Sequence, residues 1–330
     1  MVNIDLYKTL DNAYVKCNAC IRECIIPPKT KGFCGNRKNN DGKIGESYSN
    51  IFIAEVSTLK SKPILYLKDS SKNIVPPETS VLSVGGYGCN LKCIECPNPQ
   101  MSHPRRDTVS EFDRITIDQV IKQARTQNIS YIALTYNEFI PYPRTVYELT
   151  KNAKDNNIET ILITNTTFTK SFTDMFYDAG GRIMRLDIKA DIVNGDEFYK
   201  NYCGLTIMED DCSKTMKHIC ENILYSHKKG FHIEIMSAIT PIGFTPGNFQ
   251  CVGGIQKTAK WIAENLSKEV PWHLALLRPK NKWVDVQTNT TMLKFYVALA
   301  KEEGLLNVDI IDQMCDCRQE ELFCQKGCCQ

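Results

Sequence analysis

The fold is decided by one stretch, Ser80-Val81-Leu82-Ser83-Val84-Gly85-Gly86-Tyr87-Gly88-Cys89-Asn90-Leu91-Lys92-Cys93-Ile94-Glu95-Cys96. Its first five residues form an apolar run that is typical of a buried strand. Three cysteines follow in the order Cys-x3-Cys-x2-Cys, and thiolates at this spacing can hold an iron–sulfur cluster from one tight loop. Three thiolates leave one iron of a cubane without a protein ligand, and an open position is what a catalytic metal needs.

A structural zinc loop is the alternative for these three cysteines. Such a loop usually has a fourth Cys or His close by in the sequence. Here the next cysteine is Cys203, which has no evident partner, and the next histidine, His103, lies in a polar stretch. The odd number of ligands after a strand therefore favours an iron–sulfur cluster.

The strand followed by Cys89-x3-Cys93-x2-Cys96 resembles the signature of the radical S-adenosylmethionine (radical SAM) superfamily. The resemblance implies a [4Fe–4S] cluster whose open iron chelates the amino and carboxylate groups of S-adenosylmethionine (SAM). It also implies reductive cleavage of SAM to a 5′-deoxyadenosyl radical. Glu95 departs from the family pattern, which usually has an aromatic residue beside the adenine at this position.

Composition sets the broad class of the protein. The chain has 330 residues, a net charge of +2 and sixteen cysteines. In a reducing compartment so many cysteines indicate metal binding. We see no apolar run of membrane-spanning length, no signal peptide and no basic patch with interleaved aromatic residues. We therefore expect a cytoplasmic protein without membrane contact, and no nucleic-acid partner is evident.

Residues 1–78 are expected to form a cysteine-rich metal-binding region. Cys17, Cys20, Cys24 and Cys34 make a complete tetrahedral set that could hold either zinc or an auxiliary iron–sulfur cluster, while buried free thiols are the other alternative. The order Cys-x2-Cys-x3-Cys, followed by Gly-Phe-Cys-Gly-x-Arg, resembles the N-terminus of AmmeMemoRadiSam-type radical SAM proteins. Those proteins are relatives of pyruvate formate-lyase activating enzymes.

Strands and helices alternate through residues 79–280. Apolar, β-branched runs occupy residues 81–84, 131–135, 160–164, 182–188, 231–239 and 272–277, and amphipathic stretches occupy residues 117–126, 145–156, 172–177, 213–227 and 255–266. This alternation predicts an α/β fold with a parallel sheet and helices outside it. Six strands match the partial (β/α)6 barrel of the radical SAM family, in which ligands bind at the carboxyl ends of the strands.

Polar residues follow the second and third predicted strands. Tyr136-Asn137-Glu138 resembles a motif of the relatives whose backbone and acid hold the SAM amino group, and a carboxylate suits an ammonium group. A helix N-cap acid is the alternative for Glu138. Asn165 stands where the relatives place an asparagine near SAM, and the alternative is a turn asparagine.

The fourth predicted strand carries charges on one face. Because side chains alternate along a strand, Arg185, Asp187 and Lys189 share a face opposite the apolar residues that meet the helices. Charges inside a barrel are costly unless they are paired or bind a ligand. Asp187-x-Lys189 resembles the "D-L-K" of activating enzymes, which implies contact with SAM. A purely structural network of these charges is the alternative.

The same alternation places His232 and Glu234 of the fifth strand on one face, toward the cavity or, for His232, toward solvent. In the sixth strand, Pro271-Trp272-His273 resembles the "P-x-H" of activating enzymes. This resemblance makes His273 a candidate for contact with SAM or substrate, and a satisfied core histidine is the alternative.

Residues 281–330 are expected to hold a helix at 292–303 and a cysteine-rich tail. The tail contains Cys315, Cys317, Cys324, Cys328 and Cys329. These cysteines, mixed with charges, indicate a further metal site or ligation shared with the N-terminal cysteines. A disordered, redox-labile end is the alternative.

The resemblance covers roughly residues 15–280 and implies an enzyme. Its chemistry would be radical SAM hydrogen-atom abstraction by an activase-like oxidoreductase, with a protein or peptide substrate and a flavodoxin- or ferredoxin-type electron donor. A radical SAM methyltransferase or peptide-modifying enzyme is the first alternative. A non-enzymatic iron–sulfur or metal-binding electron-transfer protein is the distant one.

Overall fold

The computed structural model describes residues 4–47, 51, 53–103, 115–205, 214–239, 252–276 and 286–311. In these ranges the centre is an eight-stranded sheet with the strand order β13-β12-β11-β10-β9-β8-β7-β6. The strands are β6 (Ile53–Thr58), β7 (Ser80–Gly85), β8 (Tyr131–Leu134), β9 (Glu159–Thr164), β10 (Ile183–Ile188), β11 (His232–Ile239), β12 (Trp272–Leu276) and β13 (Val308–Ile311). From β7 to β13 neighbouring strands are parallel, whereas β6 pairs antiparallel with β7.

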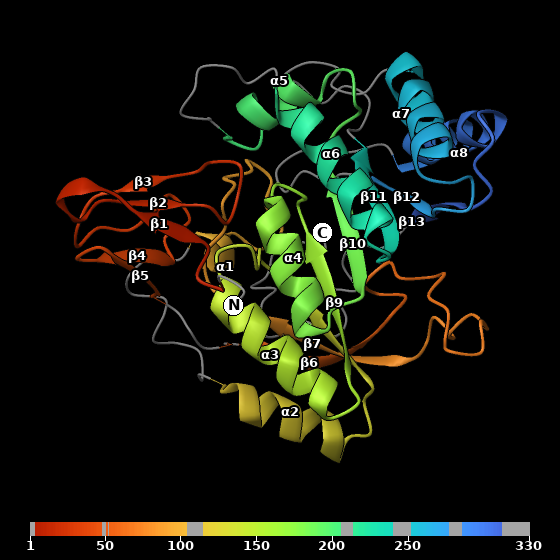
Figure 1. Ribbon diagram of the computed structural model, residues 1–330. Helices are drawn as coiled ribbons and strands as arrows, with labels where there is room; N and C mark the ends of the chain where they lie inside the picture. Colours follow the sequence, from red (N-terminus) through yellow and green to blue (C-terminus); the bar gives the residue numbers. More distant parts are fainter. Residues whose placement is uncertain are drawn as a thin grey trace.

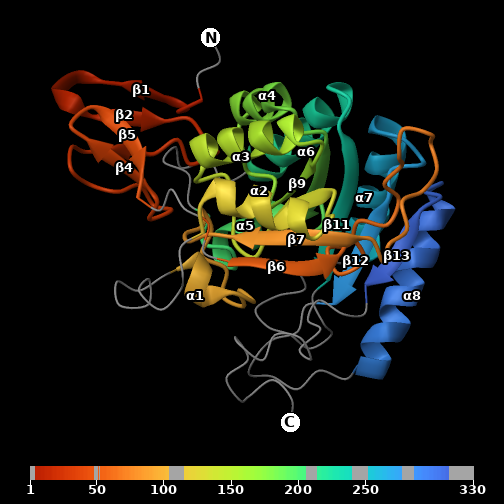
Figure 2. The ribbon, with the colours of Figure 1, turned by 90° about the horizontal axis from the view of Figure 1, so that it is seen from below.

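The helices alternate with these strands. They are α1 (Pro99–Ser102), α2 (Ile117–Thr126), α3 (Pro143–Asp155), α4 (Lys170–Ala179), α5 (Gly195–Asn201), α6 (Thr215–Lys228), α7 (Val252–Asn265) and α8 (Val286–Glu302). Figures 1 and 2 show α2, α3, α4 and α6 on one side of the curved sheet. This arrangement confirms the predicted α/β fold with a partial barrel. The six predicted strands correspond to β7 through β12.

The sequence analysis missed the two edge strands, β6 and β13. β6 lies within residues 1–78, which the sequence places in the N-terminal region. It nevertheless belongs to the central sheet, because it pairs with β7 over its full length. Of its six residues only Ile53 is buried, and Val56 is 48% exposed. An edge strand with few buried residues gives only a weak periodic signal, which explains why both edges escaped detection.

The face of β10 that points into the barrel is apolar near the amino end of the strand and charged near its carboxyl end. Ile183 joins Leu59, Ile64 and Leu67 in a separate buried cluster. Farther along β10, Arg185 and Asp187 point to the same side of the strand as Ile183. Residues 59–67, which we call the floor segment, therefore close the barrel at the amino ends of the strands. Space for a ligand remains at the carboxyl ends of the strands.

The N-terminal lobe, residues 4–47, holds β1 (Tyr7–Thr9), η1 (Asp11–Ala13), β2 (Val15–Cys17), β3 (Ile25–Ile26), β4 (Arg37–Asn40) and β5 (Lys43–Glu46). It forms two small antiparallel sheets that lie beside the barrel in Figure 1. Asn36 Nδ2 donates to the carbonyl of Pro141 at 2.9 Å, and Thr169 Oγ1 donates to the carbonyl of Asn18 at 2.7 Å. Pro141 and Thr169 precede α3 and α4, so the lobe sits over the carboxyl ends of β8 and β9.

No helix within the described ranges combines the length and apolar character that crossing a membrane requires.

Candidate functional site

A pocket of about 250 Å³ opens at the carboxyl ends of the central strands. We call it the main pocket. Its wall combines the cysteine loop after β7, the ends of β8 to β11, the segment after α5, and the floor segment. The lining residues discussed below are Lys62, Cys89, Cys93, Cys96, Tyr136, Asn137, Glu138, Asn165, Arg185, Asp187, Lys189 and Cys203.

All three signature cysteines line this pocket. Backbone hydrogen bonds from Lys92 N to Cys203 O (2.8 Å) and from Ile94 N to Tyr202 O (3.0 Å) fix the loop that carries them. Among the described residues no three His, Cys, Asp or Glu side chains converge as they would around a single metal ion. Three thiols that border a larger cavity instead fit a polynuclear cluster, because its ligands attach to different metal atoms.

Cys203 is a fourth cysteine in the main pocket, and the sequence analysis assigned it no partner. It is fully buried, and its thiol is hydrogen bonded to Cys93. Burial and this neighbour raise the pKa of Cys203, whereas the same hydrogen bond lowers the pKa of Cys93. Nothing in the spacing could have revealed the pair, since the contact depends on how the turn after α5 (Gly195–Asn201) packs against the loop.

The end of β8 supports the cysteine loop. Asn137 Oδ1 accepts a hydrogen bond from Gly86 N, and its Nδ2 donates to Gly88 O, both at 2.9 Å. Tyr136 adopts a left-handed backbone with a φ of 67°, and its hydroxyl donates to Glu55 Oε2 at 3.1 Å. These contacts hold the glycine-rich part of the loop against the strand end.

Glu138 is buried and connects β8 with β9. Its carboxylate accepts hydrogen bonds from the backbone N–H groups of Phe139, Ile140 and Asn165, and from the Thr164 hydroxyl, at 2.8–3.1 Å. Burial raises its pKa to about 7, and these hydrogen bonds act in the opposite direction. Asn165 in turn donates from Nδ2 to Asn90 Oδ1 at 2.9 Å, so it also contacts the cysteine loop.

The charged face of β10 lies in the wall of the main pocket, on the side that the alternation predicted. Asp187 Oδ1 lies 3.0 Å from Arg185 Nε, and Asp187 Oδ2 lies 3.0 Å from Lys189 Nζ. Burial would raise the pKa of Asp187, but the charges of Arg185 and Lys189 lower it overall. Burial would also lower the pKa of Lys189, yet Asp187 raises it. The three residues form an ionised network that faces the cavity.

His273 lies elsewhere and does not line the main pocket. It is the second residue of β12 and is fully buried, with Nε2 2.7 Å from Glu234 Oε2. The Glu234 carboxylate also accepts from the backbone N–H groups of Leu65 and Tyr66, in the floor segment. The structure therefore makes His273 a core histidine, held by Glu234 through Nε2 and 3.5 Å from Asp309 Oδ2 through Nδ1, because the start of β12 faces the floor of the barrel.

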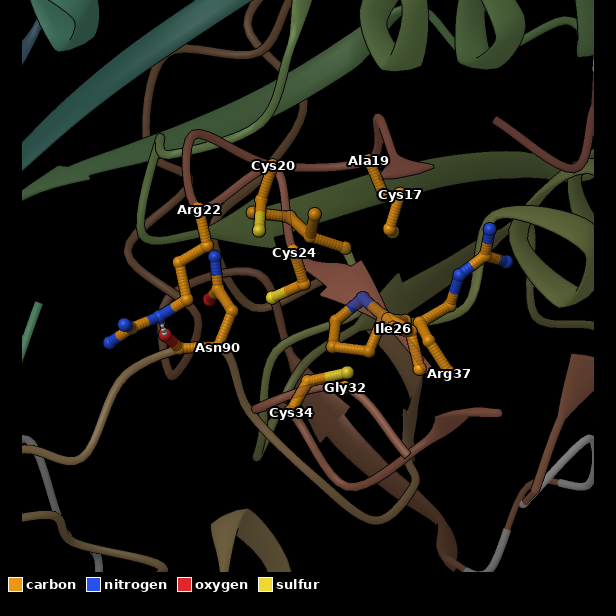
Figure 3. A pocket seen from close by; sticks show the side chains of 12 residues that line it. Cys17, Ala19, Cys20, Arg22, Cys24, Ile26, Gly32, Cys34, Arg37 and Asn90 are labelled. Carbon is orange, nitrogen blue, oxygen red and sulfur yellow. Dashed lines mark hydrogen bonds between the residues drawn. The ribbon is translucent and has the colours of Figure 1, made fainter. Parts of the chain in front are cut away.

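The four N-terminal cysteines surround a second, smaller cavity of about 20 Å³, the N-terminal cavity. Figure 3 shows Cys20, Cys24 and Cys34 around it, with Arg22 and Asn90 on one side. Burial raises the pKa of Cys34 to about 11. Burial also lowers the pKa of Arg22, whereas the thiolates of Cys20 and Cys24 act to raise it. The tail cysteines Cys315, Cys317, Cys324 and Cys328 lie outside the described residues.

The model of the Radical SAM superfamily matches residues 83–249, which include the cysteine loop and β8 to β11. The chain belongs to the radical SAM superfamily. Members of this superfamily are enzymes that use a [4Fe–4S] cluster, SAM and an external reductant. The three cysteines in the wall of the main pocket suit such a cluster.

Several known proteins are similar to this radical SAM protein. The uncharacterized protein MJ0808 of Methanocaldococcus jannaschii is 28% identical over 308 residues, which are 92% of this chain and 83% of that protein. SuiB of Streptococcus suis, solved with bound SAM, has a TM-score of 0.47 at 15% identity, covering 68% of this chain and 48% of SuiB. A domain of the pyruvate-formate lyase-activating enzyme of Bacteroides vulgatus has a TM-score of 0.40 at 14% identity, covering 54% and 96% of the two chains.

Proposed function

We propose that this protein cleaves SAM reductively in the main pocket and removes a hydrogen atom from a protein or peptide substrate. The observation that carries the proposal is the meeting of Cys89, Cys93 and Cys96 with the charged face of β10 in one cavity. When bound by these cysteines, a [4Fe–4S] cluster supplies the electron that cleaves SAM to a 5′-deoxyadenosyl radical.

The side chains of the main pocket suit the two ends of SAM. Lys189 Nζ is an ammonium group beside the cavity, and it can pair with the SAM carboxylate. Asn165 offers an amide for the ribose hydroxyls or the carboxylate. Glu138 lines the same wall, where its carboxylate can accept from the SAM ammonium group in addition to its four present donors.

The barrel also isolates a reactive intermediate. Buried apolar residues close the floor beneath Arg185, and Arg185 Nη1 donates to Lys62 O in the floor segment at 2.9 Å. A carbon radical needs such an enclosure, because exclusion of solvent prevents side reactions.

The activase-like assignment rests on the resemblance of Cys17–Arg37 and of the strand-end motifs to relatives of activating enzymes. A flavodoxin- or ferredoxin-type protein is the proposed electron donor. Methylation or another peptide modification would use the same residues. The superfamily assignment replaces the alternative of a non-enzymatic electron-transfer protein. The cytoplasmic location remains a prediction.

We also propose that Cys17, Cys20, Cys24 and Cys34 hold an auxiliary metal centre, either zinc or iron–sulfur. All four line the N-terminal cavity, and four thiols are enough in number for a full ligand set. A further metal at the tail cysteines stays a prediction from the sequence.

The experiment is anaerobic reconstitution of the full chain, followed by reduction and addition of SAM. The wild-type protein should release 5′-deoxyadenosine, and a variant with Cys89, Cys93 and Cys96 changed to Ala should release none. If the triple variant kept its iron content and SAM cleavage, the proposed site would be wrong. A glycyl-radical signal on a protein partner would support the activase assignment, whereas a methylated peptide would support the alternative.

A further inference from the structure

A buried arginine lies between the two groups of cysteines. Arg22 stands between Cys20 and Cys24, and only 4% of its surface is exposed. Its Nε donates to Asn90 O at 2.6 Å, and its Nη2 donates to Gly204 O at 2.5 Å. Asn90 directly follows Cys89, and Gly204 directly follows Cys203. One guanidinium therefore contacts the chain next to two cysteines of the main pocket.

Phe33 fixes the position of this guanidinium. The ring of Phe33 lies 3.5 Å from Arg22 Cζ, and Lys92 Nζ of the cysteine loop lies 4.9 Å from the same ring. The ring thus contacts cations from both the N-terminal lobe and the cysteine loop. Such stacking adds to the attraction of the hydrogen bonds and holds Arg22 in a single orientation.

The N-terminal cavity and the main pocket share one stretch of backbone as their common wall. Asn90 lines the N-terminal cavity, and Cys89, its neighbour in the chain, lines the main pocket. Consecutive Cα atoms are only about 3.8 Å apart. Gly88, which precedes Cys89, lies against the N-terminal lobe, because an added Cβ on Gly88 would lie 2.5 Å from the backbone oxygen of Cys34. A charge placed here acts on both groups of thiolates.

The thiols near Arg22 come from both groups. Cys20, Cys24 and Cys34 of the lobe and Cys89 of the main pocket all interact electrostatically with its guanidinium. Buried thiolates and the anionic clusters that they bind need positive charge nearby, because burial removes the stabilisation that water would give.

The size of the N-terminal cavity bears on which metal it holds. Its volume of about 20 Å³ accommodates a body at least as large as a water molecule, which needs about 10–15 Å³. The described cysteines do not converge on a single-ion position. A cluster whose thiolates attach to separate irons fits this wider arrangement.

We propose that Cys17, Cys20, Cys24 and Cys34 hold an iron–sulfur cluster and that Arg22 is a shared counter-charge, which favours the reduced forms of this cluster and of the cluster in the main pocket. The inference rests on the proposed function and chooses iron–sulfur over zinc. A buried positive charge stabilises the more negative, reduced state of a nearby cluster, and charge is among the factors that set cluster potentials.

The identity of the metal is tested by changing Cys17, Cys20, Cys24 and Cys34 to Ala in the full chain. The variant should lose about four iron atoms per chain relative to the wild type, while its remaining cluster still changes its spectrum when SAM is added. Loss of one zinc without loss of iron, or no loss of metal, would overturn the proposal. Failure of the wild-type protein to cleave SAM would instead count against the proposed function and would leave this iron count interpretable.

The role of Arg22 is tested by redox titrations followed by electron paramagnetic resonance. Arg22→Gln should lower the equilibrium constant for reduction of both clusters at least tenfold, which is about 59 mV for a one-electron couple. Arg22→Lys keeps the charge and should stay near the wild type. If Arg22→Gln assembles no clusters while Arg22→Lys does, that result also supports a requirement for the charge.

Arg182, which is exposed, is a control for the contacts of the guanidinium. Its Nη1 donates to two backbone carbonyls, Tyr177 O and Gly181 O, and its Cζ lies 3.7 Å from the Tyr177 ring. Arg182→Gln therefore removes a similar set of contacts that involves no cysteine, and it should leave both potentials unchanged. Equal shifts in Arg22→Lys and Arg22→Gln, or unchanged potentials in both, would overturn the role of Arg22.

Discussion

His273 Nε2 lies 2.7 Å from Glu234 Oε2, and neither side chain is exposed to solvent. Burial alone would raise the pKa of Glu234, but hydrogen bonds from His232 and His273 lower it to about 2. Burial alone would lower the pKa of His273, but Asp309 and Glu234 raise it above 6.5. The pair is therefore ionised and joins β11, β12 and the floor segment.

Glu234→Gln should destabilise the protein by about 3–5 kcal/mol near pH 6, because it removes the closer of the two carboxylates that stabilise the buried imidazolium. The raised pKa of His273 stabilises the fold fully below pH 6.5, and this contribution is lost as the pH rises through the raised value. On the acid side, the lowered pKa of Glu234 stabilises the fold above pH 4.5, and this contribution is lost as the pH falls toward about 2. The difference in the free energy of unfolding between wild type and variant should therefore be largest between pH 4.5 and 6.5.

Urea unfolding of the two proteins across this pH range measures the difference. Glu264→Gln is the control, because Glu264 is exposed and pairs only at the surface with Lys260, 3.8 Å away. A pH-independent difference would contradict the ion pair.

Asp187→Asn should weaken SAM binding by about 1–3 kcal/mol, because it removes the charge that positions Lys189 in the main pocket. The asparagine keeps the shape of the side chain, so the absorbance of the cluster should persist. SAM affinity is measured by equilibrium binding to the reconstituted protein.

Asp174→Asn is the control for this change. Asp174 Oδ1 binds Lys229 Nζ at 2.6 Å and the Tyr225 hydroxyl at 2.7 Å, and all three residues lie outside the main pocket. Unaltered SAM affinity of Asp187→Asn, with an intact cluster, would make the charges of β10 a structural network only.

Cys203→Ala should retain the iron of the main pocket and SAM cleavage. The three thiolates of the cysteine loop hold the cluster, and its fourth iron stays open for SAM. The cost of Cys203→Ala in stability should be on the order of 1 kcal/mol, from the lost buried sulfur. Iron content and 5′-deoxyadenosine yield are the measurements, with Cys220→Ala of α6 as the comparison. Loss of about four irons in Cys203→Ala alone would identify Cys203 as a cluster ligand.

Gly88→Ala should displace the cysteine loop from the N-terminal lobe. Gly88 has a φ of 97°, and an added Cβ would lie 2.5 Å from the backbone oxygen of Cys34. We expect a loss of more than about 1 kcal/mol in stability together with reduced iron content. Thermal unfolding and iron analysis measure the two effects.

Gly35→Ala separates the contact from the backbone strain. Gly35 also has a positive φ, of 75°, but an added Cβ there has no atom within 4 Å. It should cost stability without lowering the iron content. Equal iron loss in both variants would show that the contact with Cys34 is unimportant.

The sequence by itself determined the central strands and the direction of the β10 side chains. Strand period and β-branched runs depend on neighbouring residues, so β7 through β12 could be located before any contact was known. The spacing of Cys89, Cys93 and Cys96 likewise indicated the family, because a single loop supplies all three thiols.

Only the tertiary structure decided which distant residues share a wall. Arg22 and Gly204 are 182 positions apart, and their hydrogen bond exists because the N-terminal lobe docks over the carboxyl ends of the strands. Cys203 meets Cys93 through another long-range contact, the packing of the turn after α5 against the cysteine loop. His273 is the second residue of β12, and its position near the start of the strand places it at the floor of the barrel. Local patterns carry no information about docking or depth, because both depend on the packing of the whole chain.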